Sequence, residues 1–307
     1  MLHVYMDTRV LPVTYDVIKF LVAANAAAQV SAEDKITLHI VAHEFRDVTP
    51  RDKATPIYVK RSRTRNIYLG LSEVFHRIVA VEYTEVLPTQ VNYPCFPPAY
   101  NVNKPPAVAY GNDVLDAVHE SGLPVQVIRA SESGLNKTEY LRGTGKYVTM
   151  TLRTSPWESQ RDGSLDIWYS AYTKIKQRYE IQVYVIPDFD DICGAQLYKG
   201  YDWTCCDWVS MSPDNRLALY SGASLNLSMA GGTTTLMCLL EQVPFVSFGN
   251  LNLNSSVSTP EFYKSAGWQI GSQPKWLSSR QCFDWLEASE VTAEHIFSRA
   301  AAILDGD

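Results

Sequence analysis

Short strand-like apolar runs alternate along the whole chain with stretches in which apolar residues recur at helical spacing. Strands that alternate with helices are joined by crossover connections, which place the strands parallel in a sheet covered by helices. The alternation therefore predicts an α/β protein. The expected strands are 2–6, 36–42, 78–83, 125–129, 147–152, 181–187, 225–229 and 243–248, and the expected helices are 14–30, 64–77, 112–121, 164–178, 213–222 and 233–241, with one or two closing helices in 279–304.

A polar stretch from Ser131 to Gly145 interrupts this alternation, and a new strand follows it. A chain of 307 residues is long for one small domain and suits two. We therefore expect two Rossmann-like parallel-sheet domains that face each other across a cleft, residues 1–143 and residues 144–307.

The composition excludes several classes of protein. The formal net charge of −6 argues against a general nucleic-acid binder. No apolar run reaches the roughly 18 residues of a membrane span, and the N-terminal residues resemble a strand rather than a signal peptide. The six cysteines form no C-x-x-C pair, which predicts neither a zinc site nor a disulfide framework. We expect a cytoplasmic protein.

The segment 225–237, LNLSMAGGTTTLM, changes from a strand to a helix at two glycines. In an open parallel sheet this position is the carboxyl edge, where ligands bind. The free N–H groups of a helix N-terminus there suit a diphosphate. The plainer interpretation is a tight turn with Thr233 as the helix cap.

Two arginines follow the first strand of the second half. Arg153 comes directly after 147–152, so it is expected at the same sheet edge as Gly231, as an exposed side chain able to hold a phosphate at two points. Arg161 precedes the next helix and could do the same. The alternative is a surface ion pair of Arg161 with Glu158.

Two further motifs carry weaker signals. Gly143-Thr144-Gly145 precedes a strand, whereas a dinucleotide-binding turn follows one. Asp188-Phe189-Asp190 follows the strand 181–187 and could bind a divalent metal, cap the strand end, or contact a nucleotide through Asp188. Because the motif lies in the second strand of a second α/β unit, we expect no metal and no cofactor.

If the phosphate edge of the second half binds the donor of a transferred group, the first half is expected to receive the acceptor. An inverting transfer to a hydroxyl needs a base to take the proton of that hydroxyl. Asp7 is the preferred candidate because it ends the first strand, and Glu44 and His43 come next. Glu82 lies near the end of the third strand.

The segment 58–66, YVKRSRTRN, is rich in basic residues. It predicts a solvated helix face. Alternatively, it attracts an anionic acceptor, or a membrane surface that holds a lipid-linked one.

Residues 146–250 resemble the donor-binding domain of GT-B-fold glycosyltransferases, in the opening strand that ends at Arg153 and in the unit SLNLSMAGGTTTLMCLLEQVPFVSFG. The resemblance implies that Gly231, Gly232, Thr233 and Thr234 bind the donor diphosphate. It also likens Arg153 to the phosphate-binding arginine of fucosyltransferase-like members. Many members carry a ribose-binding glutamate on the helix after the glycines. Here Cys238 occupies that place, and Glu241 follows one turn later.

These observations predict a metal-independent glycosyltransferase of hexosyl or deoxyhexosyl type. It would move a sugar from a nucleoside diphosphate sugar to a glycan or to a lipid-linked acceptor, with peripheral membrane contact through 58–66 in the second case. The alternatives are a sugar-nucleotide epimerase with the same fold and a non-catalytic nucleotide-sugar-binding protein.

Overall fold

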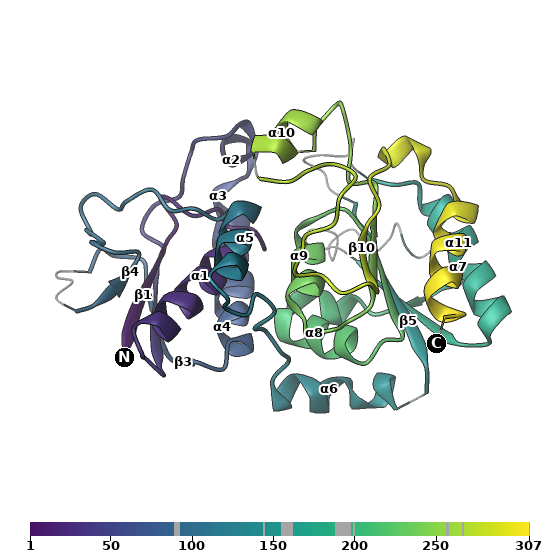
Figure 1. Cartoon of the computed structure of the whole chain (residues 1–307), viewed down its shortest axis with the longest axis horizontal. Helices are drawn as coiled ribbons and strands as arrows, with labels where there is room; N and C mark the ends of the chain where they lie inside the picture. The colour runs from purple at the N-terminus through teal and green to yellow at the C-terminus, as the bar shows by residue number, and fades with distance from the viewer. Residues whose placement is uncertain are drawn as a thin grey trace. The chain divides into compact units, whose positions relative to one another are not determined.

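The computed structural model describes residues 1–306 except 89–92, 144, 155–161, 188–197, 199, 256–257 and 266, and it describes Pro50 and Arg51 by their backbone alone. The chain divides into two compact units, Met1–Ile128 and Arg129–Asp307 (Figure 1). Each unit is built on one parallel sheet, as the alternation of elements predicts.

Unit 1 contains a sheet of order β3-β2-β1-β4, in which every described pairing is parallel. The apolar side chains Val4 and Met6 alternate along β1 with His3, Tyr5 and Asp7, and alternate side chains of a strand point to opposite faces of the sheet. The elements of unit 1 are β1 Leu2–Asp7, α1 Val17–Val30, β2 Ile36–Val41, α2 Pro50–Ala54, α3 Ile57–Arg63, a π-helix Thr64–Leu69, α4 Gly70–Val74, β3 Ile78–Thr84, β4 Cys95–Phe96 and α5 Asn112–Glu120.

Unit 2 contains a sheet of order β10-β9-β8-β5-β6-β7, again parallel throughout the described pairings. The chain starts in the middle of the sheet, runs to one edge and then returns to build the other half. This is the doubly wound order of a dinucleotide-binding domain. The elements are α6 Glu132–Arg142, β5 Tyr147–Thr151, α7 Leu165–Tyr179, β6 Gln182–Ile186, β7 Thr204–Cys205, α8 Pro213–Ser221, β8 Leu225–Met229, α9 Gly232–Leu239, β9 Phe245–Phe248, α10 Pro260–Ser265, β10 Gln281–Phe283 and α11 Ala293–Leu304.

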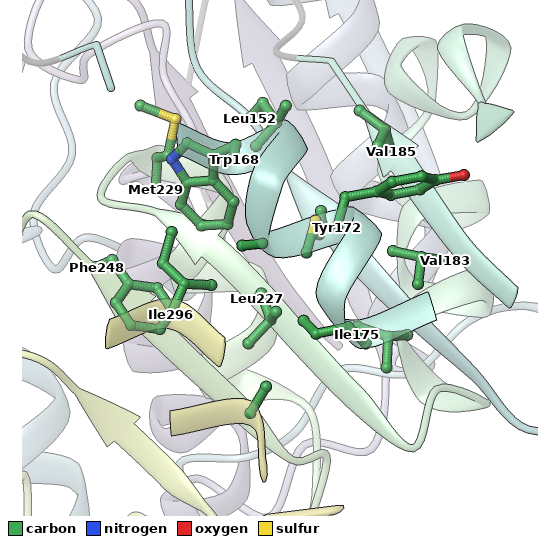
Figure 2. Packing of buried hydrophobic residues seen from close by; sticks show 14 of the residues in the cluster. Leu152, Trp168, Tyr172, Ile175, Val183, Val185, Leu227, Met229, Phe248 and Ile296 are labelled. Carbon is green, nitrogen blue, oxygen red and sulfur yellow. The ribbon is translucent and has the colours of Figure 1, made fainter. Parts of the chain in front are cut away.

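The two faces of the unit 2 sheet differ in chemistry. On one face, apolar strand residues such as Leu227 and Met229 pack against Trp168 of α7 and Ile296 of α11 (Figure 2). Trp168 also meets the ring of Phe248 edge-on. This continuous apolar layer supplies the hydrophobic stabilisation of the unit.

The opposite face carries buried hydroxyl and amide groups that bond to one another and to α8. Thr149 donates to Asn226, and Thr151 bonds to the Tyr220 hydroxyl at 2.8 Å. The Tyr147 hydroxyl donates to the Leu219 carbonyl. Because buried polar groups must be paired, these bonds fix how α8 lies on the sheet.

The structure corrects three expectations about the elements. Residues 125–129 form no ladder strand. The stretch expected as a linker holds α6, and the units divide before this helix, ahead of the expected boundary at residue 143. The reason is a capping bond of Ser131, whose backbone and hydroxyl also donate to the buried Asp214 at the start of α8. Within 279–304, the first part forms β10, and α11 alone follows as a regular α-helix.

Candidate functional site

The sequence order of unit 2 reverses between β5 and β8, which are neighbours in the sheet. Open α/β sheets bind ligands outside the carboxyl ends of the strands at such a switch point. Arg153 follows β5 by two residues, and Gly231 follows β8 by two residues. The backbone N–H of Arg153 lies 3.3 Å from the sulfur of Met229, which ends β8. The structure therefore brings these two predicted residues to neighbouring strand ends.

Gly231 is the N-cap of α9 and has an extended backbone, with φ −176° and ψ 179°. Any residue adopts this conformation, so the backbone does not require glycine here. The nearest atom to an added Cβ would be the Met229 carbonyl oxygen, 3.8 Å away. Packing therefore does not require glycine either. With no side-chain cap, the first N–H groups of α9 are left without an intrahelical partner.

Three threonines follow the glycines, and the first two, Thr233 and Thr234, are largely buried. The Thr234 hydroxyl lies 3.1 Å from the Ser228 hydroxyl, and the Thr234 N–H donates to the Gly231 carbonyl. Thr234 therefore uses both groups inside the protein. The N–H groups of Gly232 and Thr233 are the ones that helix geometry leaves for a ligand.

α9 carries no carboxylate side chain at the carboxyl edge of the sheet. Cys238 is buried, and Glu241 follows the C-terminal end of the helix. A helix after a strand runs back across the sheet, so its C-terminal end lies at the opposite edge. Ribose recognition by Glu241 at the Gly231 turn therefore does not fit the fold.

Arg153 is buried rather than exposed, with 6% of its surface accessible. Its Nε donates to a carboxylate oxygen of Asp162 at 3.1 Å. The expectation of an exposed arginine is therefore wrong, because Arg153 is buried and Asp162 supplies a counter-ion. Arg161, its expected partner Glu158, Asp188 and Asp190 lie outside the described residues.

A second group of polar side chains at this edge was missed by the sequence interpretation. Asp284 follows β10 and bonds to His295 Nε2 from the first turn of α11. The His295 ring meets Phe248 at the end of β9 edge-on. Arg299 donates to the Cys282 sulfur at 2.8 Å and lies 3.7 Å from Asp284. Because 279–304 was expected to be helical, the strand end that positions Asp284 was not recognised.

In unit 1, Asp7 ends β1 as expected, and its carboxylate is 1% exposed. One oxygen accepts from the Arg9 Nε at 2.9 Å and the other accepts from the Tyr100 hydroxyl at 2.7 Å. The hydrogen bond with Asp7 raises the pKa of Arg9. Burial raises the pKa of Tyr100, and the Asp7 carboxylate raises it further. Both carboxylate oxygens of Asp7 therefore already accept hydrogen bonds from protein groups.

The other candidate bases of unit 1 are more exposed. The Glu44 side chain is 68% exposed and lies 3.9 Å from His43. Glu82 lies within β3, which continues to Thr84, and pairs with His39 at 2.9 Å. The structure places Glu44 at the carboxyl edge of the sheet, because the Thr8 hydroxyl donates to its carbonyl.

The basic segment 58–66 does not form one solvated face. Arg61 and Arg65 are exposed, whereas Lys60 is 9% exposed and Arg63 is 4% exposed. Lys60 and Arg63 are three residues apart on α3, so they share the inward side of the helix.

A search of the described residues finds no group of three or more His, Cys, Asp or Glu side chains that could hold a metal. Across the same residues, no helix is long and apolar enough to cross a membrane.

No protein-family model matches the sequence, and no curated protein is similar to it in sequence. Solved structures do match. A glycosyl transferase of family 9 from Veillonella parvula has a TM-score of 0.52 at 12% identity, over 100% of this chain and 97% of that chain. The Escherichia coli ADP-heptose LPS heptosyltransferase II has a TM-score of 0.56 at 11% identity, over 99% of this chain and 98% of that chain.

The chain has the GT-B fold. The likeness extends over both units, and each of them has its own parallel sheet. At this level of identity the comparison establishes the fold alone.

Proposed function

We propose that this GT-B-fold chain is a glycosyltransferase that moves a sugar from a nucleoside diphosphate sugar to a glycan or lipid-linked acceptor. The observation that carries the proposal is the Gly231 turn at the switch point of unit 2. Its glycine is required neither by the backbone angles nor by a neighbouring protein atom. A glycine with room for a side chain suits a position where a ligand approaches the backbone closely.

The chemistry of the turn fits a diphosphate leaving group. The free N–H groups and the dipole of α9 favour negative charge, and that charge grows on the leaving group as the sugar departs. Arg153 on the neighbouring strand end adds a guanidinium, which Asp162 holds in place. We assign Gly231, Gly232 and Thr233 to the diphosphate. Arg153 strengthens this contact during the reaction.

Two structures with this fold support the choice of reaction. One is a family 9 glycosyl transferase and the other is an ADP-heptose LPS heptosyltransferase. An epimerase would need acid and base groups on both sides of the sugar, and a binding protein would bind the donor without turnover. Release of nucleoside diphosphate that depends on an acceptor separates a transferase from both.

Gly231→Ala tests the phosphate turn. The fold accommodates the added Cβ, so we expect the melting temperature to change little. The methyl group would occupy the place where the diphosphate meets the backbone. We therefore expect the Kd for the tightest-binding of ADP, UDP, GDP and CDP to rise about tenfold or more, which corresponds to about 1.4 kcal/mol. Calorimetry on the full chain measures both properties.

Gly306→Ala is the matched control. Gly306 follows α11, which starts at the carboxyl edge and runs back, so it lies at the opposite edge of unit 2. Its added Cβ would come 3.3 Å from the Ala302 carbonyl oxygen, a tighter contact than the 3.8 Å at Gly231, so the control perturbs its surroundings at least as much. Nucleotide affinity should be unchanged in this variant. If Gly231→Ala folds and binds nucleotide as the wild type does, the turn does not hold the diphosphate.

A further inference from the structure

Three cationic side chains of unit 1 are largely buried, and two of them, Arg46 and Lys60, lie next to the carboxyl edge of its sheet. The Arg46 side chain is 10% exposed, Lys60 is 9% exposed and Arg63 is 4% exposed. The Arg46 backbone N–H donates to the Thr8 carbonyl just after β1, and the Lys60 ammonium donates to the Arg46 carbonyl. α3 therefore turns Lys60 toward the strand ends where parallel sheets bind ligands.

The Arg46 guanidinium is held by Asp52 and Tyr110. It donates to Asp52 at 2.9 Å, it bonds to the Tyr110 hydroxyl, and it lies over the Tyr110 ring. Burial alone would lower the pKa of Arg46, but the bonds with Tyr110 and Asp52 raise it overall. Asp52 keeps a lowered pKa because its bonds with Thr49 and Arg46 outweigh its burial. Arg46 and Asp52 are therefore both ionised, and their opposite charges cancel within the pair.

Lys60 differs from Arg46. Within the described part of the chain, no carboxylate lies at ion-pairing distance from its ammonium, and its hydrogen bond to the Arg46 carbonyl is long, at 3.4 Å. The acidic side chains of the neighbouring loop, Glu44 and Asp47, are exposed. A buried ammonium without a counter-ion destabilises a fold, since its lost hydration is not replaced.

We propose that Lys60 anchors an anion subsite of unit 1 that takes a carboxylate or phosphate group of the sugar acceptor. Lys60 supplies the positive charge, and its ammonium has donors that no described carboxylate occupies. Assigning the anion to the acceptor rests on the proposed transferase function, whereas the anion site itself rests on Lys60. Exposed Arg61 and Arg65 on the same segment are outside this subsite.

The test compares Lys60→Met with Arg61→Met in the full chain. Methionine keeps the length of the side chain and removes its charge, and Arg61 is the exposed neighbour on the same helix. Inorganic phosphate and glucuronate are titrated separately, with potassium chloride at equal ionic strength as the reference. Melting temperature reports binding, because a ligand that binds the folded state stabilises it. A Gly231→Ala background removes phosphate binding at the unit 2 turn.

Without a probe, Lys60→Met should melt no lower than the wild type, because an apolar side chain replaces a buried charge that has no carboxylate partner among the described residues. With the preferred probe, the wild type and Arg61→Met should show a saturable rise. In Lys60→Met the apparent Kd should rise about tenfold or more. Lys60→Arg keeps the charge and should keep most of the response. The probe that binds more tightly identifies the anion as phosphate or carboxylate.

Two results would overturn the subsite. One is equal binding of both probes by Lys60→Met and Arg61→Met. The other is a wild type that binds neither probe while Lys60→Met melts lower, which would make Lys60 a structural residue. Neither result depends on nucleotide binding. A normal nucleotide affinity in Gly231→Ala would instead contradict the diphosphate turn and leave the Lys60 readout intact.

Discussion

At the scale of single residues, glycine and arginine carry the site of unit 2 in different ways. Gly231 was recognisable from sequence, because it stands between a strand and a helix. The surroundings of Arg153 were not, because its partner Asp162 lies in a segment without regular structure. The local sequence does not specify which residue of a loop will pair with a side chain at a strand end.

Arg153→Ala should affect both stability and turnover. Removing the guanidinium leaves the Asp162 carboxylate without this partner, and we expect a loss of about 1–3 kcal/mol in the free energy of unfolding. If Arg153 also holds the diphosphate, the same change should cost about 2.7–4 kcal/mol of transition-state stabilisation, as for removal of other such electrostatic donors. Urea unfolding and steady-state kinetics measure the two effects.

Asp162→Asn is the control for this pair. It weakens the same ion pair but retains the guanidinium, so it should lower stability while keeping most of the turnover. A common loss of turnover in both variants would assign Arg153 a structural role. The diphosphate site would then rest on Gly231 and Gly232.

At the scale of elements, strands and long helices followed the sequence pattern closely. β1, β2 and β8 lie where alternating apolar residues predict them, and α7 lies where helical spacing predicts it. α6 was taken for a linker because its sequence is polar, with Gly134 inside the helix. Its stability comes from the Ser131 cap and from Asp214, which is distant in sequence. A polar helix held by one distant carboxylate leaves no periodic apolar pattern.

Neighbouring strands of unit 1 also carry two histidines in contact, His3 and His39. The His3 Nδ1 and His39 Nε2 atoms are 2.8 Å apart, and His39 pairs with Glu82 across to β3. The His39 ring also stacks on Tyr5, which stacks on Tyr100. Burial, reinforced by His3, lowers the pKa of His39, although Glu82 opposes this shift.

Unit 1 should therefore lose stability in mild acid. Because the folded pKa of His39 lies below its ordinary value near 6.5, the unfolded chain takes up more protons in this range. The contribution of His39 is fully present above about pH 6.5 and decreases as the pH falls through the folded pKa. Urea midpoints at pH 7.5 and pH 5.5 measure the change, with His39→Gln as the comparison. An equal decrease in the wild type and in His39→Gln would show that His39 is not responsible.

At the scale of the whole molecule, the two units place different chemistry at their sheet edges. Unit 2 presents a turn with free N–H groups beside an arginine, whereas unit 1 presents an occupied Asp7 and a buried ammonium. We infer a division between donor and acceptor binding from this difference. The described residues offer no cluster of metal ligands, but Asp188 and Asp190 lie outside them.

Transfer, once a donor is identified, should survive EDTA. The N–H groups of α9 and the Arg153 guanidinium can stabilise the leaving diphosphate without a divalent ion. Turnover measured with excess chelator should match turnover in untreated protein. Loss of turnover that manganese or magnesium restores would contradict this expectation and would direct attention to Asp188 and Asp190.

The sequence by itself determined the α/β class, the presence of two parallel-sheet units and the order in which Gly231 follows a strand and opens a helix. These features depend on local periodicity and turn chemistry, which each segment carries within itself. The tertiary structure decided the strand order that brings Arg153 and Gly231 to neighbouring strand ends, the burial of Arg153 with Asp162, and the burial of Lys60 with no carboxylate of the described residues at ion-pairing distance. Those features arise when segments distant in sequence pack together, and their charges are then set by neighbours that no local pattern specifies.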